Sequence, residues 1–472
     1  MKKLGVALAG ALGLLVGGTA IAVTYLGHRL AGLPYLPFDI FDWMARTLPG
    51  GLVARSIDAM VAVIRGLRLG PTAATAKLAE QGLALAQFAG TWAVFGIVLA
   101  AVGKARPRRL TLYGAIGGLI LFAGAAAIEG AADFHGSPPF PALAWLALVL
   151  IGGGALLGLA LAAASGSASV EEAIARRRFL RLVGTGSFVV MVTAAGVSLL
   201  SKKDKKSAPG PDQEELIRAA GTSGPAASPQ PFQLEKRFPP VPGTRPELTA
   251  NRDFYRIDIN LKPPRVDGRT WRLKVEGLVD RPLALSLEDV LSRPRQTQAL
   301  TLSCISNPVG GDLISTGFWT GTPFKGILDE AGLKPQVREI FIESADGFYE
   351  SVPLSEALDG RTLLVYAMNG EPLAAEHGYP LRIFIPGHFG MKQPKWIVRM
   401  EAIDRKARGF WVDRGWSDTA FVRTTSVIDV VVTGKDAAKG GTVPVGGIAY
   451  AGEKGISLVE VRADDGPWEK AE

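Results

Sequence analysis

Five long apolar stretches in the first 200 residues limit what this chain can fold into. They lie near residues 4–27, 82–103, 110–128, 142–164 and 179–200 and are rich in Ala, Gly, Leu and Val. A helix needs roughly 20 apolar residues to cross a bilayer, and each stretch is about that long. We therefore predict an all-α transmembrane bundle over residues 1–200 rather than five buried helices of a soluble protein.

Basic residues near the ends of these stretches predict their orientation. The basic residues fall in three clusters, which are Lys2 and Lys3, then Lys104, Arg106, Arg108 and Arg109, then Arg176, Arg177, Arg178 and Arg181. If successive stretches cross in alternating directions, all three clusters lie on the cytoplasmic side, as the positive-inside rule requires. Residues 28–81 and 201–472 then lie outside the cytoplasm. The net charge of +8 needs no nucleic-acid partner, because these clusters orient helices.

The chain changes character after residue 200. Residues 201–247 are rich in Pro, Gly, Ser and Lys, which predicts a linker that cannot bury enough surface to fold. Residues 248–425 alternate short apolar strands with turns, which predicts a mixed α+β domain of mostly β character. Ser286 is expected to cap a helix, with Asp289 in its third position. Residues 426–472 contain further strands, including 427–432 and 456–462, and are typical of the beginning of a β-sandwich.

The single cysteine of the chain lies in Ser303-Cys304-Ile305-Ser306-Asn307-Pro308, after a strand-like run and before a Gly-rich loop. A lone cysteine is usually an inert core residue. The position of Cys304 at a strand end favours a functional role instead. A thiolate suits soft or high-valent metals, and one thiolate needs further ligands from a cofactor.

Two other segments bring cations close together in the sequence. They are residues 376–382, with His377 and Arg382, and residues 390–396, with Lys392 and Lys395. Arg and Lys beside backbone amides form anion sites, although any one of these charges alone is more often solvated. The sequence has no phosphate-binding loop of the Gly-Lys-Ser/Thr kind, no Gly-x-Ser-x-Gly and no zinc-type His/Cys spacing, which removes common nucleotide-binding and hydrolase classes.

Residues 248–425 resemble the molybdopterin-binding domain of the sulfite oxidase superfamily. The resemblance rests on five motifs that occur in the family's order, which are Asn369-Gly370-Glu371-Pro372-Leu373, His377-Gly378-Tyr379-Pro380-Leu381-Arg382, Pro386-Gly387, Gly390 and Lys395-Trp396. It implies a molybdenum–molybdopterin cofactor whose metal is bound by Cys304. It also implies cofactor contacts from Asn251, Tyr255, Arg256, Asp346, His377, Arg382, Gln393, Pro394 and Lys395. In this family an immunoglobulin-like dimerisation domain often follows, and residues 426–472 fit its beginning.

The expected substrate pocket departs from the sulfite-oxidising members. Those members carry arginines shortly after the metal-binding cysteine, whereas here Asn307 is followed by Pro308-Val309-Gly310-Gly311. Trp416 stands where they use a tyrosine. We therefore place Asn307, Arg414 and Trp416 in the pocket, and Arg414 or Arg423 is left to supply positive charge. A pocket without such charges should bind a small dianion poorly, since each charged hydrogen bond contributes roughly 1.5–3 kcal/mol.

Arg176-Arg177-Arg178-Phe179-Leu180-Arg181 precedes an apolar run and resembles a twin-arginine export signal. That route carries folded proteins, which suits a domain that receives its cofactor in the cytoplasm. The alternative is a plain cytoplasmic anchor before a helix. We expect a retained multi-pass anchor in the cytoplasmic membrane, with the catalytic domain on the outer side.

Together these features predict a molybdopterin-dependent oxidoreductase that transfers an oxygen atom to or from a small sulfur compound, in a direction left open. No haem domain is fused to the chain, and only His28 and His135 lie near the helices. Electrons are therefore expected to pass through a separate partner, a cytochrome or a quinone-linked protein. Two alternatives stay open, a non-catalytic membrane receptor or assembly protein and a quinone-linked electron-transfer subunit.

Overall fold

The computed structural model describes residues 5–104, 106–132, 140–165, 170–203, 240–433 and 443–471. Its contacts divide the chain into two compact units. One contains Met1–Leu48 and Lys77–Lys206, and the other contains Pro49–Ala76 and Ser207–Glu472. This division differs from the boundary predicted at residue 200, because residues 49–76 pack with the C-terminal part of the chain.

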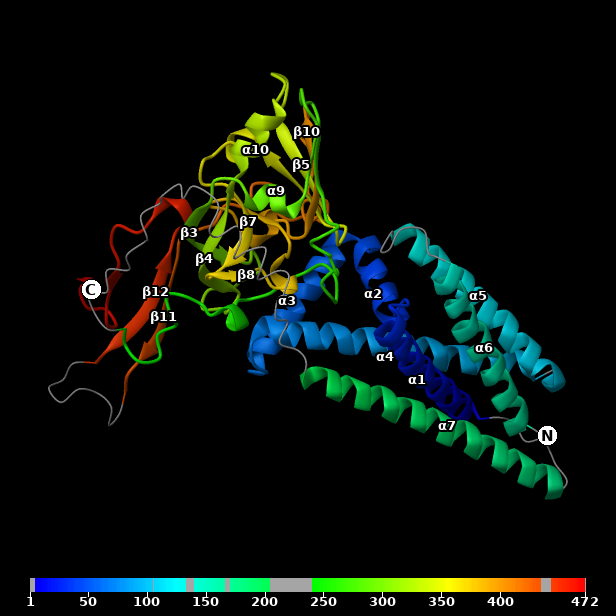
Figure 1. The fold of residues 1–472 in the computed structure, drawn as a ribbon. Coiled ribbons are helices and arrows are strands. Elements are labelled where there is room, and N and C mark those ends of the chain that lie inside the picture. The colour runs from blue at the N-terminus through cyan, green and yellow to red at the C-terminus, as the bar shows by residue number, and fades with distance from the viewer. Residues whose placement is uncertain are drawn as a thin grey trace. The chain divides into compact units, whose positions relative to one another are not determined.

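The first unit is helical (Figure 1). Its helices are α1 (Val6–Ala31), α2 (Leu36–Thr47), most of α4 (Thr72–Gly103), α5 (Leu110–Ala132), α6 (Phe140–Ser165) and α7 (Val170–Lys203). By length and composition, α1, α4, α5 and α6 could each cross a membrane. These four helices confirm the first four apolar stretches of the sequence as long apolar helices.

The fifth predicted stretch, residues 179–200, lies within α7. The apolar part of this helix, Arg181–Val197, is shorter than those of the other four. The helix also continues to Lys203, so the predicted linker does not begin at residue 201. Residues 204–239, which make up most of that linker, lie outside the described residues.

Glycines allow α5 and α6 to pack backbone against backbone. A Cβ atom added at Gly114 would lie 2.2 Å from the carbonyl oxygen of Gly154, and one at Gly158 would lie 2.3 Å from that of Leu110. Each helix carries two glycines four residues apart, Gly114 and Gly118 in α5 and Gly154 and Gly158 in α6. Such pairs let helices approach closely in the absence of bulky side chains.

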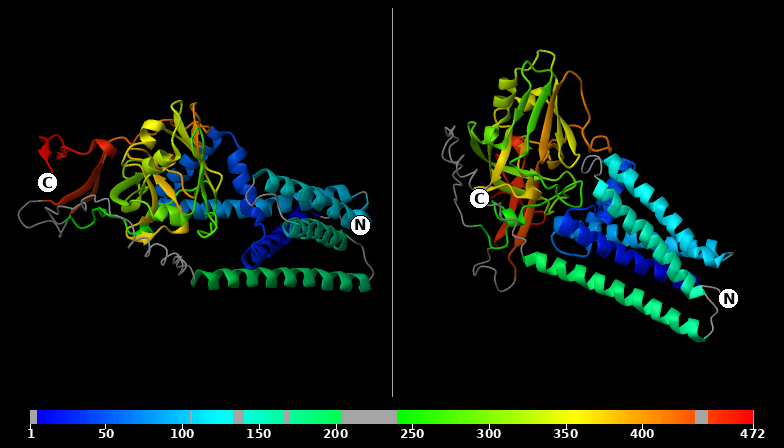
Figure 2. Two further views of the ribbon diagram at one scale, coloured as in Figure 1. Left: turned by 45° about the horizontal axis from the view of Figure 1, so that its top comes forward. Right: turned by 45° about the vertical axis from the view of Figure 1, so that its right-hand side comes forward.

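The second unit contains two five-stranded sheet systems that form its core (Figure 2). The first has the order β2 (Leu283–Leu285), β1 (Leu273–Gly277), β10 (Ile397–Ile403), β5 (Glu339–Ser344), β6 (Tyr349–Pro353). The second has the order β3 (Gln296–Ser303), β4 (Ile314–Pro323), β7 (Leu363–Met368), β8 (Glu371–Pro372), with β9 (Arg382–Phe384) also paired to β7. Pairing is antiparallel except between β1 and β10. The predicted mixed, mostly β domain is confirmed.

Short helices connect these strands. They are α9 (Leu287–Leu291), α10 (Phe324–Ala331) and α11 (Leu354–Ala357), with α3 (Gly50–Gly66) added from the N-terminal part of the chain. At the start of α9, the Ser286 hydroxyl accepts from the Asp289 N–H while Asp289 accepts from the Ser286 N–H. This reciprocal pair confirms the predicted cap and its third-position acid. Trp319, Phe324 and Leu273 are fully buried and belong to one hydrophobic core.

Two hairpins follow the second sheet. Strand β11 (Thr425–Val431) pairs with β12 (Val445–Tyr450), and β13 (Glu460–Val461) pairs with β14 (Glu469–Lys470). The predicted strand over 427–432 is confirmed in β11. The strand predicted over 456–462 is wrong in its length, because only residues 460–461 of that segment pair with another strand. The immunoglobulin-like interpretation of residues 426–472 stays a prediction.

Candidate functional site

Cys304 lies directly after the last residue of β3. Its N–H donates to the Leu313 carbonyl at 2.9 Å, and its own carbonyl accepts from the Asn307 N–H at 3.0 Å. These bonds close the loop between β3 and β4 and hold the thiol at the strand end. The sulfur lies 3.1 Å from the Ser306 hydroxyl, and the residue keeps partial exposure. Burial of the sulfur raises the pKa of the Cys304 thiol.

Tyr255 lies beside this strand end. A Cβ added at Gly390 would lie 2.7 Å from the Tyr255 hydroxyl and 3.6 Å from the Ser303 carbonyl oxygen. Gly390 begins the short helix η4 (Gly390–Lys392), so three distant segments meet here. Burial first, and then the neighbouring Cys304, raises the pKa of Tyr255 well above its usual value. The phenol is therefore a neutral hydrogen-bond donor near the cysteine.

Three cations gather around one buried carboxylate. The Asp258 side chain is fully buried and pairs with both Arg256 and Lys395. Lys395 also donates to the Glu376 carbonyl at 3.0 Å, and the buried Arg382 donates to the His377 carbonyl at 3.1 Å. Burial lowers the pKa of Lys395 to about 8 and that of Arg382 to about 10. Three cations and one carboxylate leave two positive charges in excess.

Two donors of this cluster are unsatisfied. Among the described residues, Arg382 Nε and Arg256 Nη2 are buried without a hydrogen-bond partner. Buried charged donors normally find acceptors, so their pairing is incomplete in the protein alone. A phosphate monoester dianion supplies both the missing acceptors and the missing negative charge. The cluster therefore fits the phosphate end of a pterin cofactor.

A glycine makes the approach of these cations feasible. Gly378 has φ of +112°, and a Cβ there would lie 3.0 Å from Arg382 Cβ and 3.1 Å from Lys395 Cβ. Only glycine adopts such a backbone readily while leaving that space free.

His377 ends the short helix η3 (Ala375–His377) and is buried. Its ring hydrogen-bonds to the backbone of Asn251. Burial, and then the charges of Lys395 and Arg382, lowers the pKa of His377 to about 3. The imidazole is therefore neutral and adds no charge to the cation cluster.

Several predicted cofactor residues make side-chain or backbone hydrogen bonds that hold the fold together. The Asn251 amide donates to the Met368 carbonyl at 3.1 Å and to Glu371 at 2.8 Å. The Gln393 amide accepts from the Ile385 N–H at 2.6 Å and donates to its carbonyl at 2.7 Å. The Pro394 carbonyl accepts from the Ile383 N–H, and Asp346 caps its own turn by accepting from the Phe348 N–H at 3.0 Å. These four residues position neighbouring loops, and direct contact with a cofactor stays a prediction for them.

The predicted substrate-pocket residues separate into two groups. Trp416 joins a hydrophobic cluster formed by Ile305, Phe389, Met391, Trp411, Val412 and Ala420. Ile305 follows Cys304, so the indole lies close to the cysteine loop. The Asn307 side chain accepts from the Leu313 N–H at 3.0 Å and closes the same loop. Arg414 instead donates to the Phe410 carbonyl at 2.8 Å and lies 3.5 Å from that ring's centre, while Arg423 is exposed.

Two acidic residues that organise the site, Asp258 and Glu350, were not predicted from the sequence. Asp258 lies two residues after Arg256, and this short spacing could have predicted an ion pair between them. Glu350 is fully buried and pairs with Lys392 at 2.8 Å. Because Glu350 lies 42 residues from Lys392, nothing local marks the pair. Lys392 is therefore engaged in holding η4 and is not part of the cation cluster.

Comparison with known proteins decides the family. Residues 260–411 match the family described as "oxidoreductase molybdopterin binding domain". The uncharacterized oxidoreductase YuiH of Bacillus subtilis is 34% identical over 171 residues, which cover 36% of this chain and 84% of YuiH. The chain belongs to the sulfite oxidase superfamily of molybdopterin-dependent oxidoreductases.

Other members of the superfamily match more distantly. Mouse mitochondrial sulfite oxidase is 29% identical over 288 residues, covering 52% of each chain, so this chain spans about half the length of that enzyme. A putative protein-methionine-sulfoxide reductase subunit, YedZ1, of Azospira oryzae is 30% identical over 187 residues, covering 40% of this chain and 68% of that one. These relatives indicate an enzyme with a molybdopterin cofactor and speak against a non-catalytic receptor.

Proposed function

We propose that this oxidoreductase transfers an oxygen atom to or from a small, neutral sulfur compound of the sulfoxide or thioether type. The observation that carries the proposal is the environment of the Cys304 loop. The next six residues, 305–310, contain no basic side chain, and Ile305 packs among Phe389, Trp411 and Trp416. Such walls accept an uncharged substrate more readily than a dianion.

The cofactor supplies the two-electron redox chemistry when it is bound. In this proposal Cys304 is the protein ligand to the metal, held in place by its backbone bonds to Leu313 and Asn307. Arg256, Arg382 and Lys395 hold the phosphate, and Asp258 fixes two of these cations in the absence of cofactor. The neutral Tyr255 hydroxyl is placed to donate a hydrogen bond beside the cysteine.

The charges that would bind sulfite are positioned unfavourably. Arg414 is held by the carbonyl and ring of Phe410, and Arg423 is exposed. By contrast, Trp416 Nε1 is a buried donor with no partner among the described residues. A sulfoxide oxygen would accept from this indole without bringing a charge into the cluster. The name of the Azospira oryzae relative, a putative protein-methionine-sulfoxide reductase subunit, agrees with this choice.

We place the catalytic domain outside the cytoplasm, and contacts within the second unit support this topology. A Cβ added at Gly50 would lie 2.2 Å from Arg414 Cα, and the Thr72 N–H donates to Asp312 at 2.7 Å. Residues 49–76 and the catalytic domain must therefore lie on the same side of a membrane. An even number of crossings between them satisfies this, so α7 crosses together with α4, α5 and α6. The basic residues of the loops favour the outer side as that common side.

Export by the twin-arginine route and use of a separate electron carrier belong to the same proposal. The side chains of Arg176 and Arg177 lie outside the described residues, and Arg178 and Arg181 are exposed. Among the described residues, no group of three His, Cys, Asp or Glu side chains could hold a metal ion. We assign electron exchange with the proposed metal site at Cys304 to a separate carrier, a cytochrome or a quinone-linked protein.

The proposal is tested with the full chain purified from membranes. Molybdenum and pterin content are measured first, and reduction of methyl sulfoxides by a reduced dye is compared with sulfite oxidation. Cys304→Ser should lose metal and turnover together. Trp416→Phe should keep its metal but lose about 2–10-fold in kcat/KM for sulfoxides, as expected for one neutral hydrogen bond. A preparation that oxidises sulfite efficiently and ignores sulfoxides would overturn the substrate assignment.

A further inference from the structure

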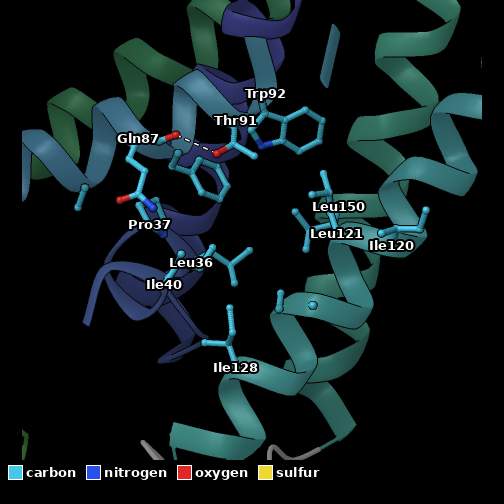
Figure 3. Close-up of a pocket in the computed structure, with 14 residues that line it drawn as sticks. Leu36, Pro37, Ile40, Gln87, Thr91, Trp92, Ile120, Leu121, Ile128 and Leu150 are labelled. Atoms are coloured by element: carbon cyan, nitrogen blue, oxygen red, sulfur yellow. Dashed lines mark hydrogen bonds between the residues drawn. The ribbon is translucent and has the colours of Figure 1, made fainter. Parts of the chain in front are cut away.

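A pocket of about 190 Å³ lies inside the helical unit (Figure 3). Helix α2 contributes Leu36 and Ile40, and these face Leu121 and Ile128 of α5 across the cavity. Trp92 and Thr91 of α4 close one end in this view, and Gln87 of the same helix lies near α2. The proposed catalytic chemistry does not use this pocket.

We infer that the pocket binds the ring of a lipid-soluble quinone or quinol. The inference rests on the proposed function, because it names the electron partner that the molybdenum reaction needs. A cavity of about 150 Å³ lined by apolar side chains is known to accept benzene, so the volume here suits one six-membered ring. Phe88 and Trp92 offer aromatic surfaces for a flat ligand. Helices apolar enough to lie in a membrane form most of the walls, and quinones are dissolved there.

Two polar side chains distinguish this pocket from a space for a lipid tail. Gln87 Nε2 lies 2.7 Å from the Met44 sulfur, which is a weak acceptor. A quinone carbonyl is a stronger acceptor and would replace that contact. The Thr91 hydroxyl donates to the Gln87 carbonyl at 3.0 Å and keeps a lone pair for a quinol hydroxyl. A hydrocarbon chain could form a hydrogen bond with neither the Gln87 amide nor the Thr91 hydroxyl.

These groups match the needs of quinone chemistry. Oxidation of a sulfur compound with water releases two electrons and two protons, and a quinone takes up two of each to become the quinol. In the reverse direction, a quinol supplies the same two electrons and two protons for reduction of the oxide. In either direction the ring oxygens gain or lose the protons that accompany the two electrons.

Binding is measured by quenching of tryptophan fluorescence when ubiquinone-1 is added to the full chain in detergent. Gly124 lines the pocket, and a Cβ there meets nothing within 4 Å, so Gly124→Leu should fill the cavity without a clash. We expect this change to weaken binding at least tenfold and Gln87→Leu to weaken it about threefold to tenfold. Gly152→Leu is the matched control, because Gly152 also has open space, is exposed and does not line the pocket. It should bind as the unmodified chain does.

Equal affinity in the Gly124→Leu, Gly152→Leu and unmodified chains would overturn the inference, provided that thermal unfolding shows all three folded. Displacement of ubiquinone-1 by palmitate at equal concentration would overturn it in favour of a lipid tail. If Gly124→Leu does not fold, the affinity of Gln87→Leu for ubiquinone-1 is the test, and an affinity equal to that of the unmodified chain would overturn the inference. Cys304→Ser should bind ubiquinone-1 normally, so failure of the quinone site and failure of the metal site give different results.

Discussion

The absence of a side chain at Gly378 lets Arg382 and Lys395 approach each other. Gly378→Ala would place a methyl group against both Cβ atoms in a left-handed backbone, at 3.0 and 3.1 Å. We expect a loss of about 1–3 kcal/mol in stability from strain and a loss of bound pterin. Pterin fluorescence and thermal unfolding measure these two effects.

Gly370 provides the control for that prediction. Its φ is +79°, but a Cβ there meets nothing within 4 Å. Gly370→Ala should therefore cost similar backbone strain and retain pterin. Equal pterin loss in both variants would mean that strain, and not the cation cluster, explains the result.

His377 makes stability depend on pH in the cofactor-free chain. Its folded pKa is about 3 and its ordinary value is 6.5, so the unfolded chain binds more protons between these values. The contribution of His377 to the free energy of unfolding is fully present above pH 6.5. It is lost as the pH falls toward 3, by about 1.4 kcal/mol per pH unit. Chemical unfolding at pH 7, 6 and 5 measures this slope. His377→Gln can still donate to Asn251 but cannot titrate, so its slope should be smaller; an unchanged slope would contradict the assignment.

Among the elements, α5 and α6 pack closely because glycines face each other across their contact. Gly154→Leu would drive a side chain into the Gly114 carbonyl, which lies 2.3 Å from the added Cβ. Overpacking of this kind costs about 1–3 kcal/mol or more. Thermal unfolding in detergent should show a lower midpoint for Gly154→Leu than for Gly152→Leu, which has open space two residues away. Equal midpoints would mean that the two helices do not pack closely.

Element positions were predicted well where the signal was local. The apolar runs of α1, α4, α5 and α6 and the cap of α9 depend on neighbouring residues, and all were found. The strand expected over 456–462 was mostly absent, because apolar alternation alone does not provide a partner strand. The packing of α3 with the catalytic domain was also missed, since only distant residues such as Arg414 determine it.

The whole molecule has a topology that can be tested directly. Single cysteines introduced at Ser56, Arg108 and Ser426 are all at exposed positions, and Cys304 gives the baseline label. In spheroplasts, a membrane-impermeant maleimide should label Ser56→Cys and Ser426→Cys. Arg108→Cys should react only after lysis, because its loop is expected on the cytoplasmic side. Labelling of Arg108→Cys in intact spheroplasts would contradict α4 as a crossing helix, and failure of Ser426→Cys to react there would contradict α7 as one.

The sequence by itself determined the long apolar helices α1, α4, α5 and α6, the place of Cys304 at a strand end and the order of the family motifs. These features depend on runs of neighbouring residues, whose composition and spacing are visible directly. Only the tertiary structure decided which charges pair. It placed Asp258 between Arg256 and Lys395, assigned Lys392 to Glu350 and bound the Gln393 amide to Ile385. Such pairings depend on distances between residues far apart in the chain, and burial makes those distances decisive because a buried charge or amide must find a partner.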